Sequence, residues 1–122
     1  MSKIQIKAET KSKNSNHKFI GKGLKRGPKI IYYDGKIKTQ IIIEDKISII
    51  REGEYYIELN LQEKNNLEGK YQTAYGYLSL KSSNVHINKT ANSLYLKYDL
   101  LVNDEFVDTF EYNLNFSLDT IS

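Results

Sequence analysis

The chain has 122 residues, of which 39% are apolar and 27% charged, and its formal net charge is +3. This length suits one domain with a single core, and the composition excludes a disordered or fibrous protein. The absence of cysteine excludes disulfides and thiolate metal sites and favours a cytoplasmic location. No apolar run approaches the roughly 20 residues of a membrane span, and the alternating N-terminus is not expected to be a signal peptide. We therefore expect a single domain over residues 1–122.

The front of the chain combines one strand with a basic segment. Over residues 3–10, isoleucine and alanine alternate with charged and polar residues, which predicts a strand. Residues 11–28 are rich in lysine, asparagine and glycine, and we interpret them as a basic loop or an irregular hairpin. Residues 1–30 hold nine Lys/Arg and one acid, whereas the remainder holds nine Lys/Arg and fourteen acids. The basic charge is therefore confined to the front.

From residue 29 onward, short alternating runs rich in isoleucine, tyrosine and threonine recur every 8–12 residues or so, with turn residues between them. We predict strands over residues 29–33, 36–43, 46–51, 55–61, 67–73, 77–88, 94–102 and 106–118. Asp34-Gly35 is the strongest hairpin signal, and we predict a type I′ turn there. No segment places apolar residues at a helical period better than it alternates.

These runs predict an all-β domain. In the last one, the even-numbered residues 106–118 form an apolar face interrupted only by Asp108, and the odd-numbered residues form a mostly polar face. Successive strands joined by short turns make an antiparallel up-and-down meander. Closure into a barrel of about 8–10 strands would remove the exposed sheet edges.

Such a meander predicts where a site would lie, because successive turns must alternate between the two ends of the barrel. One mouth collects the turns at residues 34–35, 52–53, 74–76 and 103–104. Period-two alternation then brings polar and aromatic side chains to that mouth. The candidate ligand-binding residues are Tyr33, Arg51, Tyr71, Thr73, Tyr75, Tyr98 and Asp108.

Arg51 is the sharpest candidate, since it continues the inward face of Ile47 and Ile49. A buried guanidinium without a partner would cost several kcal/mol, so we expect an acidic partner, and Asp108 is the obvious one. Arg51 could contact an anionic ligand. Alternatively, it closes the barrel end as a structural plug or extends its charged head to solvent.

Tyrosine is the second clue. Six tyrosines fall on predicted inner faces, namely Tyr33, Tyr55, Tyr71, Tyr75, Tyr98 and Tyr112. A filled barrel would be served better by phenylalanine or leucine, because each unpaired buried hydroxyl costs about 1–3 kcal/mol. Either these tyrosines line a partly wet cavity, or half of them lie at the rims.

Other signals are weak. A possible patch for RNA or an acidic partner consists of Lys18, Lys22, Lys25, Arg26 and Lys29. Few aromatic residues accompany it, which argues against nucleic acid. No phosphate loop, nucleophile motif or metal-ligand cluster is present, so we predict no cofactor, no metal and no catalytic residues. His86 is expected to face outward, which argues against a His-ligated haem.

Several of these segments together resemble the YwiB-like family, a small bacterial family of unknown function with a lipocalin-like (calycin) β-barrel. They are Tyr32 to Gly35, Ile50 to Gly53, Tyr71 to Gly76, and Leu96 to Leu100 with Asn103. The most specific piece is Tyr-x-Thr-x-Tyr-Gly at residues 71–76, where the family commonly has proline at the position of Ala74. The resemblance spans about residues 29–117. It implies a lipocalin-like barrel in a bacterial cytoplasm and supplies no activity.

Our first hypothesis is a non-enzymatic barrel that binds a small anionic or aromatic ligand at one mouth. The alternative is an interaction module that binds RNA or an acidic partner through residues 11–29. An enzyme ranks last. The oligomeric state is left open.

Overall fold

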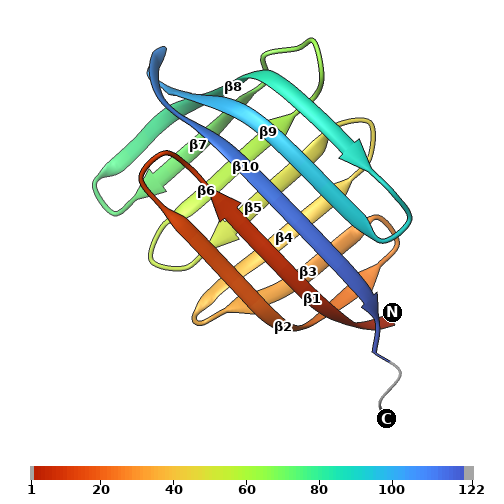
Figure 1. The fold of residues 1–122 in the computed structure, drawn as a ribbon. Coiled ribbons are helices and arrows are strands. Elements are labelled where there is room, and N and C mark those ends of the chain that lie inside the picture. The colour runs from red at the N-terminus through yellow and green to blue at the C-terminus, as the bar shows by residue number, and fades with distance from the viewer. Residues whose placement is uncertain (1, 120–122) are drawn as a thin grey trace.

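The computed structural model describes residues 2–119, which form a closed barrel of ten antiparallel strands (Figure 1). The strands are β1 Ser2–Lys11, β2 Asn16–Arg26, β3 Lys29–Asp34, β4 Ile37–Ile43, β5 Ile47–Glu52, β6 Tyr56–Leu61, β7 Glu68–Thr73, β8 Gly76–Lys89, β9 Ser93–Val102 and β10 Glu105–Leu118. Each strand pairs with its sequence neighbour, and β10 pairs with β1 to close the barrel. The all-β meander predicted from the sequence is confirmed, and it is consistent with a lipocalin-like fold.

The turns alternate between the two ends, as a strict meander requires. The end that carries the β1–β2, β3–β4, β5–β6, β7–β8 and β9–β10 turns is called the open end below, and the opposite end, near which β1 begins and β10 finishes, is called the closed end (Figure 1). The predicted grouping of four hairpins at one mouth is therefore confirmed, and the β1–β2 turn joins them.

The basic segment after β1 differs from the prediction, because most of it is the regular strand β2. Ten residues of β2 pair with β1, from Ser2↔Lys25 to Lys11↔Asn16. Its glycines allow close packing. A Cβ on Gly23 would lie 2.3 Å from Ile6 Cδ1 and 2.7 Å from the Ile31 carbonyl oxygen. A glycine-rich composition here therefore reflects tight strand packing and not a loop.

The turn chemistry also differs at one hairpin. Asp34 pairs with Ile37, so the loop is Gly35-Lys36, and of these two residues only Gly35 has a positive φ (+63°). That pattern fits a type II′ turn and not the predicted type I′. At the β9–β10 hairpin, both loop residues, Asn103 and Asp104, have positive φ (49° and 67°), as a type I′ turn requires.

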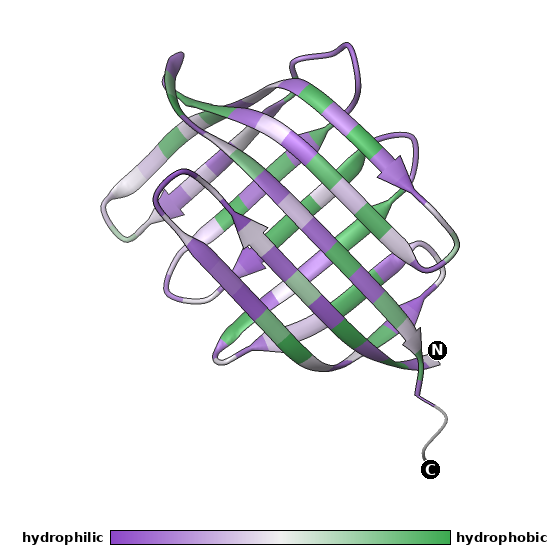
Figure 2. Cartoon of the chain, viewed as in Figure 1, coloured by the Kyte–Doolittle hydropathy of each residue, from purple (hydrophilic) through white to green (hydrophobic). Residues whose placement is uncertain are grey.

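The core fills the closed end. Ile30, Ile41, Ile49 and Leu59 are paired in sequence across β3 to β6 and form one inward row. The next row toward the closed end contains Ile43, Ile47 and Leu61. Hydropathy alternates along the strands, as period-two exposure predicts (Figure 2). Within residues 2–119, no helix is long and apolar enough to cross a membrane.

Candidate functional site

One row of inward side chains lies just toward the open end from the aliphatic rows. Cross-strand pairing places its members next to one another, in the order Tyr32, Thr39, Arg51, Ile57 and Tyr71. Between the adjacent aliphatic row and this one, which are two residues apart along each strand, the inward side chains change from aliphatic to mostly polar and aromatic. This change marks the boundary between the filled and the hollow part of the barrel.

The open end contains a cavity of about 400 Å³. Its aliphatic residues include Ile49 and Leu59 toward the closed end and Leu80, Leu100 and Val102 from β8 and β9. Aromatic rings add to the wall, because Phe19 stacks on Tyr32 with ring centroids 4.6 Å apart, and Tyr98 stacks on Phe110 at 5.8 Å. The cavity can therefore hold a small, largely apolar molecule.

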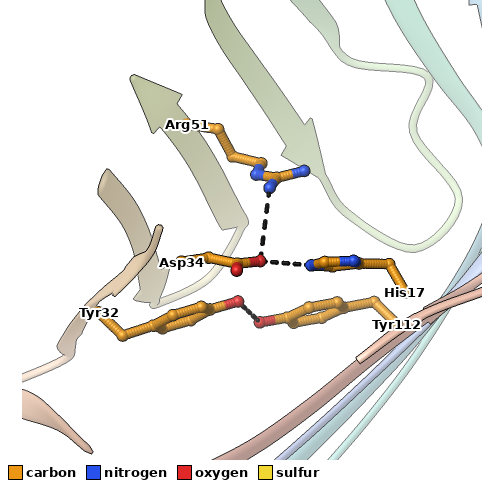
Figure 3. A network of polar contacts seen from close by, with 5 residues as sticks. All are labelled: His17, Tyr32, Asp34, Arg51 and Tyr112. Carbon is orange, nitrogen blue, oxygen red and sulfur yellow. Dashed lines mark hydrogen bonds and ion pairs between the residues drawn. The ribbon is translucent and has the colours of Figure 1, made fainter. Parts of the chain in front are cut away.

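A charged cluster lies at the mouth of this cavity (Figure 3). Asp34 Oδ2 accepts a hydrogen bond from His17 Nε2 and lies 4.0 Å from an Arg51 guanidinium nitrogen. The three side chains come from β2, β3 and β5, so the contact joins strands that do not all pair directly. Since the Arg51 side chain is 38% exposed, this ion pair contributes little stability.

Below that cluster, two tyrosine hydroxyls meet across the cavity. Tyr32 Oη and Tyr112 Oη are 2.9 Å apart (Figure 3). Burial raises the pKa of Tyr112 well above its usual value and also raises the pKa of Tyr32, where the hydrogen bond from Tyr112 partly offsets it. Both phenols therefore stay protonated at neutral pH and act as hydrogen-bonding groups.

Two further polar side chains of the cavity wall are those of Thr39 and Tyr98. Thr39 is 2% exposed, and its Oγ1 makes no hydrogen bond to any residue from 2 to 119. Interaction with the Thr39 hydroxyl slightly lowers the pKa of Tyr32, but the two hydroxyls do not have the geometry of a hydrogen bond. Tyr98 is buried, and burial raises the pKa of its hydroxyl while the Arg51 charge lowers it in part.

Three of the seven predicted site residues line the cavity, namely Arg51, Tyr71 and Tyr98. The inward orientation of Arg51 is thus confirmed. Of the other tyrosines predicted to face inward, Tyr112 lines the cavity. Tyr55 does not, because it lies in the β5–β6 turn, half exposed, with its ring 5.7 Å from that of Tyr71.

Three other predicted positions are wrong. Tyr33 is 60% exposed, because its neighbour Tyr32 takes the inward place in β3. Tyr75 is fully exposed in the two-residue β7–β8 loop, where no strand alternation applies. Thr73 lies outside the cavity wall, and its Oγ1 accepts a hydrogen bond from the Tyr75 backbone N–H at 3.1 Å.

The predicted Arg51–Asp108 pair is also wrong. A β-bulge between Phe106 and Asp108 inserts an extra residue into β10, so that the even-numbered face is interrupted there and Phe106 is exposed. Asp108 Oδ1 instead accepts a hydrogen bond from the next backbone N–H, that of Thr109, at 2.7 Å. Its side chain lines a separate hollow outside the cavity. The acid that meets Arg51 is Asp34.

The predicted basic patch lies on β2 and at the start of β3. It comprises Lys18, Lys22, Lys25, Arg26 and Lys29. Several of its charges have local partners, since Lys18 lies 3.7 Å from Glu9 and Lys22 lies 3.6 Å from Asp119. Lys25 Nζ donates to a backbone carbonyl at 2.8 Å. The patch is therefore less free to bind an anion than the sequence suggests.

Sequence reasoning missed five residues with polar side chains that line the cavity: Thr10, His17, Tyr32, Asp34 and Thr39. His17 was assigned to a loop and Asp34 to a turn. The period-two series His17, Phe19, Gly21 and Gly23 would have indicated the inward face of β2. Thr39 could also have been identified from the sequence, because it is a polar residue on the same predicted strand face as Ile41 and Ile43.

The described residues offer no cluster of three or more His, Cys, Asp or Glu that could hold a metal ion. His86 is exposed on β8, as predicted. The polar groups that line the cavity are phenols, the two threonines Thr10 and Thr39, and the His17, Asp34 and Arg51 cluster. This arrangement can donate hydrogen bonds and hold an anion.

Comparison with known proteins places the chain in a family. A search of curated proteins found no match. The crystal structure of the ywiB protein from Bacillus subtilis is similar, with a TM-score of 0.63 and 14% sequence identity over 97% of this chain and 91% of that one. At this identity the likeness shows the fold alone. The model of a domain of unknown function, DUF1934, matches residues 1–114, and this chain therefore belongs to that family.

Proposed function

We propose that this barrel is a non-enzymatic binding protein that holds one small ligand in the cavity at its open end. The observation that carries the proposal is the cavity itself, whose volume of about 400 Å³ lies within the range typical of small-molecule sites. Mostly apolar walls with a few convergent polar groups are the usual composition of such sites. We further propose a cytoplasmic location, on the lack of cysteine, and a bacterial source, on the resemblance to the YwiB-like family.

A cavity-filling variant tests the proposal. Ala8 lines the cavity, so Ala8→Leu should reduce the space for a ligand, whereas Ala91→Leu makes the same change in an exposed turn at the closed end. The probe is decanol, a neutral amphiphile, and the readout is the ligand-induced rise in Tm, together with native mass spectrometry of the purified protein. A ligand that binds only the folded state must raise Tm.

We expect wild type and Ala91→Leu to show the same rise in Tm and Ala8→Leu to show a smaller one. Equal rises in all three proteins would mean that decanol binds elsewhere. If decanol and a panel of small aromatic alcohols leave the Tm of wild type unchanged, and no ligand is carried through purification, the proposal fails.

The alternative, binding of RNA or an acidic partner through residues 11–29, stays a prediction. The local partners of Lys18, Lys22 and Lys25 do not favour it. It would require binding that weakens steeply with salt and is lost when Lys22, Lys25 and Arg26 are changed to Glu.

A further inference from the structure

We infer that the cavity contains an oxyanion subsite, formed by Thr39, Arg51 and Tyr98, and that its ligand is a monocarboxylate with an apolar body. This inference rests on the proposed function and names the chemical class of ligand for the same cavity. It is carried by the position of these three side chains and by the hydrogen-bond donors that they offer.

The three groups belong to the wall of one cavity. Thr39 and Arg51 are direct cross-strand partners on β4 and β5, and both line the cavity, so their side chains lie side by side. Tyr98 comes from β9, on another part of the wall, and its hydroxyl is close enough to Arg51 for the charge to lower its pKa. All three side chains therefore face the same cavity.

Each of these groups has a donor to offer. The guanidinium of Arg51 carries five N–H donors, and its one ion-pair contact, with Asp34, is as long as 4.0 Å. Thr39 Oγ1 is the buried side-chain polar atom that has no hydrogen-bond partner within residues 2–119, whereas burial and the Arg51 charge decide the pKa of the Tyr98 hydroxyl. A buried hydroxyl without a partner is costly, by about 1–3 kcal/mol, so such a group is expected to have one in the functional state. A carboxylate, which only accepts, matches three donors that face one cavity.

The charge of the region favours a single negative charge over two. Arg51 is the one Lys or Arg among the residues that line the cavity, and Asp34 already lies at its edge. A dianionic phosphate would be repelled by Asp34 and could be neutralised only in part by Arg51. The aliphatic wall of Ile49, Leu59 and Leu80 requires an apolar body.

Isothermal titration calorimetry tests this inference with three probes that share one chain: decanoate, decanol and decyl phosphate. We expect wild type to bind decanoate at least about tenfold more tightly than decanol, as hydrogen bonds to a charged group would provide. Arg51→Met should remove this preference, and its circular dichroism spectrum and Tm show that the variant is folded. Arg26→Met, the same substitution at an exposed position on β2, should behave like wild type.

The hydroxyls should act in the same direction with smaller effects. Thr39→Val and Tyr98→Phe should each weaken decanoate binding by about threefold to tenfold and reduce the ratio of decanoate to decanol affinity. Asp34→Asn should tighten decanoate binding, because it removes the negative charge that competes for Arg51.

The outcomes separate the two proposals. If decanol and decanoate bind with equal affinity and Arg51→Met changes neither, the oxyanion subsite is wrong while the binding function stands. If decyl phosphate binds more tightly than decanoate, the assignment to a carboxylate is overturned. If none of the probes binds, both the subsite and the proposed function fail.

Discussion

The two ends of the barrel are built from the same strands and have different interiors. On β3, β4 and β5, the residues Ile30, Ile41 and Ile49 form a buried aliphatic row, and one row further the same strands carry Tyr32, Thr39 and Arg51. Toward the closed end the interior is packed, and toward the open end it leaves a cavity of about 400 Å³.

This difference shows that the alternation along a strand does not by itself decide what its inward side chains do. Period two decides which side chains face inward, and it is the same at both ends. The position along the strand decides whether an inward side chain fills the core or lines the cavity. The open end is therefore less tightly packed than the closed end. Its polar groups lie along the cavity, because in a packed aliphatic core they would lack hydrogen-bond partners.

The largest expected effect is a difference in stability between a leucine-to-alanine substitution at the closed end and one at the open end. Leu61→Ala removes a fully buried side chain from the closed end and should lower the free energy of unfolding by about 2–5 kcal/mol. Leu78→Ala changes a cavity residue that is 40% exposed, and we expect less than about 1.5 kcal/mol. Urea denaturation measures both. Equal losses would mean that the open end is packed as tightly as the closed end.

The tyrosine pair at the open end should have an intermediate effect. Tyr32→Phe or Tyr112→Phe leaves one buried hydroxyl without its partner and should cost about 1 kcal/mol. The double variant should cost no more than either single variant, because both hydroxyls are then gone. Tyr77→Phe, on an exposed ring, is the matched control. Additive losses in the double-mutant cycle would show that the two hydroxyls do not interact.

A pH effect is expected at the bulged wall of the open end. Thr109 Oγ1 and Asn84 Nδ2 donate to Asp99 at 2.6 and 2.7 Å, and these bonds hold the pKa of Asp99 below its ordinary value of 3.8. Because the pKa is lower in the folded state, the carboxylate stabilises the fold above that value, and the contribution is lost as pH falls through the depressed pKa.

Asp99→Asn should therefore destabilise the protein more at pH 7 than at about pH 3, as measured by urea denaturation at both values. Asp45→Asn, in the exposed β4–β5 turn of the closed end, serves as the control. A difference between Asp99→Asn and wild type that does not change with pH would contradict the role given to these hydrogen bonds.

The smallest effect is expected for an exposed residue at the rim of the open end. Tyr75 is fully exposed and outside the cavity wall, so Tyr75→Ala should change the free energy of unfolding by less than about 0.5 kcal/mol. It should also leave decanol binding unchanged. A loss of binding in this variant would show that the site extends over the β7–β8 hairpin.

The fold could be predicted because alternation and turn residues recur in every segment from residue 29 onward. The closed end is the clearest case, since Ile41, Ile47 and Leu61 are separated from polar neighbours by the period of a strand. The regularity of β2 was not predicted, because its glycines and lysines are typical of a loop or an irregular hairpin. Its glycines are required by packing against Ile6 and Ile31, which only the three-dimensional structure reveals.

The site was predicted in part. Arg51, Tyr71 and Tyr98 belong to unbroken alternating strands, and alternation placed them correctly. Tyr33 failed because two isoleucines and two tyrosines follow one another, so that both registers look equally apolar.

Asp108 failed for a different reason. A bulge breaks alternation in β10 without a glycine or proline to signal it. The partner of Arg51 depends on contacts between β3 and β5, which are separated by β4 and cannot be read from local spacing.

The most direct test of the central claim is a methyl NMR titration of wild type with decanol. Decanol in the cavity should shift the methyl signals of Ile49, Ile57, Leu59, Leu80 and Leu100 and leave those of Ile4, Ile47, Leu61 and Leu94 at the closed end nearly unchanged. Shifts confined to an exposed residue such as Ile20, or no shifts at all, would contradict the claim that the open end is a binding cavity.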